Sequence, residues 1–179
     1  MKRVDSREQY LNEVSTIVGM NCNAIELGVL KGDFSQMILD ILKPNSLYLI
    51  DPFEANKQKY DDGLTTAYST IDEYHFVLTR FEGNKNVLVD KNYSFDAVKD
   101  CKKKFDFIYI DACHLYECVK RDLNDWLPKL KKGGLMCGHD YAKMYGFGVV
   151  EAVDEFCKEH DFEMIIYNNN GSDWALKQK

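Results

Sequence analysis

Two acids and two histidines stand just after two apolar segments of the chain, and together they could carry out proton transfer, metal binding, or both. They are Asp111 and His114, after the run 105–110, and His139 and Asp140, after the run 134–137. Both runs read as buried strands. Neighbouring parallel strands lie about 4.8 Å apart and end at one edge of the sheet, where open α/β proteins bind ligands. If these two strands are neighbours, the four side chains converge on one pocket.

The composition indicates one globular domain. The chain has 179 residues, of which 45% are apolar and 13% aromatic. That length supports one substantial core and is short for two. We therefore expect a single domain over 1–179, with an N-terminal helix within 1–20 and the core within 21–179. No apolar run approaches the roughly 18 residues of a membrane helix, and the first residues lack a secretory segment, so no membrane partner is expected.

The net charge and the cysteine pattern further limit which functions and which cellular compartment are expected. The net charge of −6 argues against a general nucleic-acid binder, which needs a basic face to neutralise phosphates. The six cysteines contain no Cys-x-x-Cys pair, and several lie in apolar strand or helix contexts. Buried thiols in a reducing compartment are therefore expected, which predicts a cytoplasmic protein.

Strand-like runs alternate with helical periodicity along the chain. Strands are predicted over 22–27, 47–50, 87–89, 105–110, 134–137, 162–167 and 173–176. Helices are predicted over 6–18, 32–42, 71–81, 95–101, 115–130 and 149–157, the fifth of them closed by the Lys-Lys-Gly-Gly sequence at 131–134. Strands that are apolar on both faces predict an α/β fold, with a mostly parallel seven-stranded sheet and helices on both faces. The turn signal Asn-Asn-Asn-Gly at 168–171 predicts that the last two strands pair antiparallel at one edge of the sheet.

The turns after the first two core strands carry residues suited to a nucleoside ligand. In the first turn, Gly28 and Gly32 would let the backbone approach a ligand closely, and Glu26 precedes them. The motif is not Gly-x-Gly-x-x-Gly, which disfavours a dinucleotide site and an NAD-linked oxidoreductase. Asp51 ends the second strand, where an acid can accept hydrogen bonds from both ribose hydroxyls. The alternatives are an ordinary turn around Gly28 and a helix-cap or turn role for Asp51.

Taken together, these motifs resemble the class I S-adenosylmethionine-dependent methyltransferases, and most closely the compact branch of small-molecule and sugar O-methyltransferases. The resemblance covers about 21–176. It rests on six segments in order: 24–32 (AIELGVLKG), 49–53 (LIDPF), 106–117 (DFIYIDACHLYE), 130–134 (LKKGG), 138–141 (GHDY) and 149–156 (VVEAVDEF). It implies a Rossmann-like methyltransferase fold, S-adenosylmethionine as cofactor, and a small-molecule or sugar acceptor. A homodimer is compatible with the sequence, which contains nothing that requires one.

The resemblance also implies roles for individual residues. Those expected to contact the cofactor are Glu26, Gly28 and Gly32 (methionine part), Asp51 (ribose), Phe53 (adenine face), Tyr93 and Ser94 (adenine edge), and Asp111. Tyr93 departs from the Gly-Asp-Ser that relatives often carry at 92–94, which weakens the adenine-edge assignment.

Some relatives bind a divalent cation with the acid after the fourth strand and the acidic pair after the fifth. The matching residues are Asp111, His139 and Asp140. Mg²⁺ prefers oxygen ligands, whereas the imidazole of His139 suits Mn²⁺, Fe²⁺ or Zn²⁺ better. The alternative is that His139 is not a ligand.

His114 matches a general base of some sugar-modifying relatives, and an imidazole pKa near the working pH would suit removal of a hydroxyl proton. The alternative is that His114 caps or packs on the following helix. The sequence therefore predicts methyl transfer to oxygen, with Asp111 and His114 as catalytic residues. The irregular stretch 54–70 is expected to be a lid or acceptor-binding loop, or else a surface loop. The rival function is a non-catalytic nucleoside-binding or regulatory module of the same fold.

Overall fold

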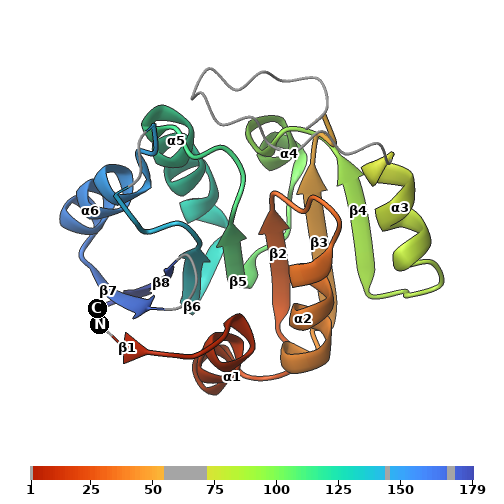
Figure 1. The fold of residues 1–179 in the computed structure, drawn as a ribbon, viewed down its shortest axis with the longest axis horizontal. Coiled ribbons are helices and arrows are strands. Elements are labelled where there is room, and N and C mark those ends of the chain that lie inside the picture. Colours follow the sequence, from red (N-terminus) through yellow and green to blue (C-terminus); the bar gives the residue numbers. More distant parts are fainter. Residues whose placement is uncertain (1, 55–71, 144–145, 169–171) are drawn as a thin grey trace.

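The computed structural model describes residues 2–54, 72–143, 146–168 and 172–179, and within them helices cover both faces of one eight-stranded sheet (Figure 1). The sheet order is β1-β7-β8-β6-β5-β2-β3-β4. The strands are β1 (Lys2–Arg3), β2 (Asn23–Leu27), β3 (Ser46–Asp51), β4 (Val87–Lys91), β5 (Phe105–Ile110), β6 (Leu130–Gly138), β7 (Phe162–Asn168) and β8 (Asp173–Gln178). The α-helices are α1 (Arg7–Val18), α2 (Asp33–Leu42), α3 (Glu73–Arg80), α4 (Ser94–Asp100), α5 (Tyr116–Trp126) and α6 (Val149–His160).

Alternation along the strands divides the core into two layers. In β2, Ala24 packs in the layer formed by α1, α2 and α3, whereas Ile25 and Leu27 pack in the layer formed by α4, α5 and α6. A sheet buried on both faces needs strands that are apolar throughout, which is why β5 is buried at five of its six positions. The predicted α/β fold, mostly parallel and covered on both faces, is confirmed.

The end of the sheet near the termini differs in two details from the prediction. The antiparallel strand is β8, and it lies between β6 and β7 rather than at the edge. Its residues Trp174, Ala175 and Leu176 are fully buried, as an interior position requires. In addition, β1 pairs parallel with β7, so the described sheet has eight strands instead of seven.

The helix predicted over 115–130 is shorter, because α5 ends at Trp126 and a 3₁₀ turn follows at Leu127–Lys129. Pro128 lies in this turn and has no N–H to continue an α-helix. The Lys-Lys-Gly-Gly segment that was expected to close the helix belongs to β6 instead. It forms an irregularity in the β5–β6 pairing, where a Cβ on Gly134 would lie 2.9 Å from the carbonyl oxygen of Asp106. Glycine therefore serves close strand packing here rather than a helix end.

The remaining predicted elements are confirmed in type, with small shifts at their ends; α3, for example, begins at Glu73 rather than at Ile71. Most of the stretch 54–70 and of the turn 168–171 lies outside the described residues, so their predicted roles stay predictions. Within the described part of the chain, none of the helices combines the length and apolar character that crossing a membrane demands.

Candidate functional site

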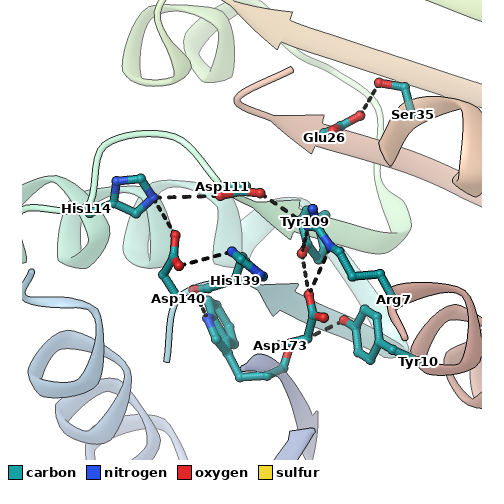
Figure 2. Close-up of polar contacts among 11 residues, drawn as sticks. Arg7, Tyr10, Glu26, Ser35, Tyr109, Asp111, His114, His139, Asp140 and Asp173 are labelled. Atoms are coloured by element: carbon teal, nitrogen blue, oxygen red, sulfur yellow. Dashed lines mark hydrogen bonds and ion pairs between the residues drawn. The ribbon is translucent and has the colours of Figure 1, made fainter. Parts of the chain in front are cut away.

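The four groups singled out by their spacing meet at the carboxyl ends of β5 and β6, which are parallel neighbours. We call Asp111, His114, His139 and Asp140 the acid–histidine cluster (Figure 2). Nε2 of His114 lies 2.9 Å from Oδ2 of Asp140 and 3.7 Å from Oδ1 of Asp111. Nδ1 of His139 lies 3.2 Å from Oδ1 of Asp140. The predicted convergence is therefore present, with Asp140 between the two histidines.

Backbone pairing places the cluster. The N–H of Asp111 donates to the carbonyl of Leu27 at 2.8 Å, and the N–H of His139 donates to the carbonyl of Ile110 at 3.3 Å. Trp174 donates its indole N–H to the carbonyl of His139 at 3.0 Å. Asp140 has φ 57°, a left-handed conformation that aspartate tolerates better than most residues. The cluster is thus built where regular β6 ends in a turn.

His114 is held by the segment between β6 and α6. Its ring stacks on Phe147 at 4.5 Å between centroids, with 4° between the ring planes. Its carbonyl accepts a hydrogen bond from the N–H of Gly148 at 2.9 Å. A Cβ on Gly148 would lie 2.4 Å from the backbone nitrogen of Tyr116, so glycine permits this close approach. His114 therefore both packs on its neighbours and faces the cluster.

The two histidines and Asp140 stabilise each other's charged forms. Burial alone would lower the pKa of His114, but the nearby carboxylates of Asp111 and Asp140 raise it to about 9. Burial opposes the charge of Asp140, yet its close contacts with His114 and His139 hold its pKa well below the usual range. The pKa of His139 is also raised, through Asp140, against the effect of burial. His114 is therefore an imidazolium at neutral pH, rather than the group near its own pKa that the sequence predicted.

Three members of the cluster could hold a divalent cation. Candidate ligand atoms of Asp111, His139 and Asp140 all lie within 4.8 Å of one another. Nε2 of His139 is buried and has no hydrogen-bond partner among the described residues. Two carboxylates and an imidazole nitrogen form a donor set that suits Mn²⁺ or Fe²⁺ better than Mg²⁺. The residues present fit such an ion.

Asp51 joins the turns that follow β2 and β3. Its Oδ2 accepts from the N–H groups of Val29 at 2.7 Å and Leu30 at 3.0 Å, and its Oδ1 accepts from the N–H of Phe53 at 2.6 Å. This is the turn-bracing role that the sequence left as the alternative. Each carboxylate oxygen can accept more than one hydrogen bond, so the brace does not prevent ribose binding.

Glu26 lies beneath the first turn and is only 2% exposed. The hydroxyl of Ser35, in the first turns of α2, donates to its carboxyl group (Figure 2). Burial raises the pKa of Glu26 to about 8, so this carboxyl is mostly protonated at neutral pH. In this structure Glu26 anchors α2 to β2, and its predicted contact with a cofactor stays a prediction.

The two glycines of the first turn are required by their surroundings. Gly28 has φ +89°, and a Cβ there would lie 2.1 Å from the carbonyl oxygen of Asp111. Gly32 has φ +75°, and its Cβ would lie 2.8 Å from the ring of Phe81. The turn after β2 can therefore lie directly against the start of the cluster only because residue 28 has no side chain.

The residues predicted to meet the adenine have protein partners. Phe53 lies 5.3 Å from Tyr74 between ring centroids, and the hydroxyl of Tyr93 donates to Glu54 at 2.8 Å. The hydroxyl of Ser94 donates to the buried Asp122 of α5 at 2.5 Å. Ser94 thus links α4 to α5, and this bond could not be predicted from the sequence because it depends on how the two helices pack.

Sequence reasoning missed Arg7, Tyr109 and Asp173, which lie beside the cluster. Arg7 is 3.3 Å from Asp111, and Tyr109 donates to Asp173 at 2.5 Å. The available signal was weak: a tyrosine within an apolar strand, and an acid that begins one. Arg7, at the start of α1, carries no distinguishing pattern.

Comparison with known proteins identifies the family. The family model described as "Methyltransferase domain" matches residues 25–141, which run from within β2 to just beyond β6 and contain the whole acid–histidine cluster. The chain belongs to this methyltransferase family. None of the curated protein sequences matches the chain.

Solved structures resemble this methyltransferase over nearly its whole length. The O-methyltransferase NovP is 17% identical, with a TM-score of 0.69 over 97% of this chain and 80% of its own. An O-methyltransferase from Bacillus cereus in complex with SAH (S-adenosylhomocysteine) is 14% identical, with a TM-score of 0.67 over 96% of this chain and 80% of its own. An rRNA methylase from Streptococcus thermophilus is 11% identical, with a TM-score of 0.66 over 96% of this chain and 93% of its own. At these identities the likeness establishes a Rossmann-like methyltransferase fold and does not identify the acceptor.

Gly28→Ala should destabilise the methyltransferase by more than the about 1–2 kcal/mol that a left-handed alanine costs, because its Cβ would collide with the backbone of Asp111. Gly83→Ala is the matched control: Gly83 has φ +77° and nothing within 4 Å of a Cβ. The measurement is urea unfolding of both variants. If both variants lost the same free energy of unfolding, the close approach of the turn after β2 to Asp111 would be contradicted.

Asp140→Asn should lower the pKa of His114 from about 9 toward its ordinary value of 6.5, because it removes the nearer carboxylate. Histidine NMR titration measures this pKa. Asp72→Asn, which alters the remote pair with His75, is the control.

The raised folded-state pKa of His114 also means that its contribution to stability is complete below about pH 6.5 and is lost as the pH rises through 9. The wild-type protein should therefore lose more thermal stability than the variant between these pH values. An unchanged His114 pKa would contradict the ion pair.

Proposed function

We propose that this methyltransferase transfers the methyl group of S-adenosylmethionine to a hydroxyl oxygen of a small molecule or sugar, at the acid–histidine cluster. The observation that carries the proposal is the meeting of Asp111, His114 and Asp140 at the carboxyl ends of adjacent parallel strands. The turn after β2, which would hold the donor, lies directly against Asp111. Donor and acceptor could therefore be held next to each other.

The cofactor would lie over the turns after β2 and β3. The proximity of these turns, which Asp51 bridges, supports a ribose held by Asp51 and an adenine beside Phe53. The close approach of backbone at Gly28 and Gly32 supports a methionine part that follows the first turn, above Glu26. Tyr93 stays a candidate for the adenine edge, whereas the bond from Ser94 to Asp122 weighs against that role for Ser94.

The chain's own residues would position the acceptor and move its proton. Methyl transfer from a sulfonium needs the attacking oxygen in line with the methyl group, so most of the rate gain should come from orientation. His114 would take the hydroxyl proton once it has lost its own. Its contact with Asp140 would then hold the ring toward the acceptor and stabilise the imidazolium that forms.

A divalent cation, Mn²⁺ or Mg²⁺, would be held by Asp111, His139 and Asp140, and when bound it would favour the alkoxide form of the acceptor. The mutual proximity of their ligand atoms supports this assignment. A diol, as in a sugar or a catechol, would offer the ion two oxygens. The net charge of −6 favours such an acceptor over a nucleic acid.

Asp51→Asn should weaken the binding of SAH at least about tenfold, which corresponds to about 1.4 kcal/mol, because it removes a charged acceptor of ribose hydroxyls. Calorimetry measures the affinity. Asp40→Asn on the exposed side of α2 is the control and should bind as the wild type does. If the Asp51 variant binds SAH normally, the acid does not hold the ribose.

Asp111→Ala should abolish methyl transfer while the far-ultraviolet circular dichroism stays that of the wild type, because the side chain is partly exposed and lies at the cluster rather than in the core. The assay follows a labelled methyl group into sugar and catechol acceptors. Turnover close to the wild-type rate would contradict the proposed chemistry.

Without added cation, kcat/KM should rise with pH up to about 9, since His114 accepts a proton only after losing the one that Asp111 and Asp140 stabilise. In Asp140→Asn the same limb should move to lower pH. A profile that is flat from pH 6 to 9 would show that His114 is not the base.

A further inference from the structure

Arg7 lies on the side of Asp111 opposite His114 (Figure 2). One terminal nitrogen of its guanidinium donates to Oδ2 of Asp111 at 3.3 Å and also to the hydroxyl of Tyr109. The other carboxylate oxygen of Asp111, Oδ1, is the one that faces His114. Asp111 therefore lies between the guanidinium of Arg7 and the imidazole of His114.

We propose that Arg7 is the positioning residue for Asp111: it holds one oxygen of this carboxylate so that the other is presented to the reacting groups. The inference deepens the proposed function and rests on it for its catalytic consequence. The pairing of Arg7 with Asp111 can be tested separately.

The guanidinium is well placed to act as a fixed point. It stacks on the ring of Phe34 in α2, with 4.0 Å from Cζ to the ring centroid, and lies 5.5 Å from the ring centroid of Tyr109. Nε is 3.7 Å from Oδ1 of Asp173, whose side chain is fully buried. Tyr109 in turn donates to the same oxygen of Asp173 at 2.5 Å. The guanidinium is thus constrained by α2, β5 and β8.

The surroundings of Arg7 keep it charged. Burial alone would lower its pKa, but Tyr109, Asp111 and Asp173 raise it above the ordinary value. Burial raises the pKa of Tyr109 well above its usual range, so the tyrosine stays neutral and can pass a hydrogen bond from Arg7 to Asp173. Arg7 therefore keeps a positive charge beside Asp111.

Arg7 and Asp173 both lie outside the residues that the family model matches. The start of α1 and the start of β8 therefore reach the cluster from the two flanking segments of the chain. Since Arg7 is 104 residues from Asp111 in sequence, this contact exists only because α1 packs on the same sheet face as α2.

A double-mutant cycle tests whether Arg7 holds Asp111. Arg7→Met keeps an apolar side chain against Phe34 and removes the charge, and Asp111→Asn removes the other partner. Arg7→Met should lower the folding equilibrium constant of the wild-type protein. In the Asp111→Asn background, the factor by which Arg7→Met lowers this constant should be smaller by at least about threefold. Arg80→Met is the matched control, because Arg80 pairs with Asp33 and lies over the ring of Phe81. Its effect should be the same in both backgrounds.

The second measurement follows methyl transfer with acceptors that the wild-type protein uses. Arg7→Met should lower kcat at least about tenfold while SAH affinity and the acceptor KM stay within about twofold, since only the orientation of Asp111 changes. Arg7→Lys should recover part of the loss, and Lys179→Met, which removes the cation that pairs with Asp161 at the other end of β8, should show none.

The outcomes separate the two proposals. Additive effects of Arg7→Met and Asp111→Asn on stability would overturn the positioning role, whatever the activity. An unchanged kcat in Arg7→Met would overturn its catalytic consequence. If the wild-type protein fails to bind SAH, the proposed function fails, while the cycle still decides whether Arg7 holds Asp111.

Discussion

The parallel pairing of β2, β5 and β6 is the constraint on which the site depends. Because the three strands end at the same edge, the backbone of Asp111 bonds to Leu27 and that of His139 bonds to Ile110. Gly28 lets the first turn lie against Asp111 at a distance that no side chain would permit. The functional groups are thus placed by main-chain hydrogen bonds and by close packing, and the side chains need little freedom to meet.

Charge within the cluster is balanced by pairing. Asp140 lies between two histidines, and Asp111 lies between His114 and Arg7. Each carboxylate that could bind a divalent cation already has a cationic side chain beside it. A bound cation would therefore have to replace these contacts or share them. The two histidines hold the pKa of Asp140 below its usual range although the side chain is partly buried, and the carboxylates in turn explain why His114 keeps its proton before any ligand binds.

The sequence predicts the cluster well because Asp111, His139 and Asp140 directly follow apolar runs whose strand character is unmistakable. It predicts α5 and β6 less well because a lysine–glycine pair closes helices and also permits close strand packing, and only the contact of Gly134 with Asp106 distinguishes the two. Local sequence patterns do not predict that β8 lies inside the sheet or that Arg7 contacts Asp111. Both depend on how distant segments pack against the sheet, which no spacing along the chain records.

The central claim is that the cofactor binds beside the acid–histidine cluster, and histidine NMR during titration with SAH tests it most directly. The chain has four histidines, of which His114 and His139 belong to the cluster and His160 ends α6, where its ring lies against Phe156. We predict that SAH shifts the resonances of His114 and His139 and leaves His160 unchanged. Saturating SAH without any shift at His114 and His139 would contradict the account.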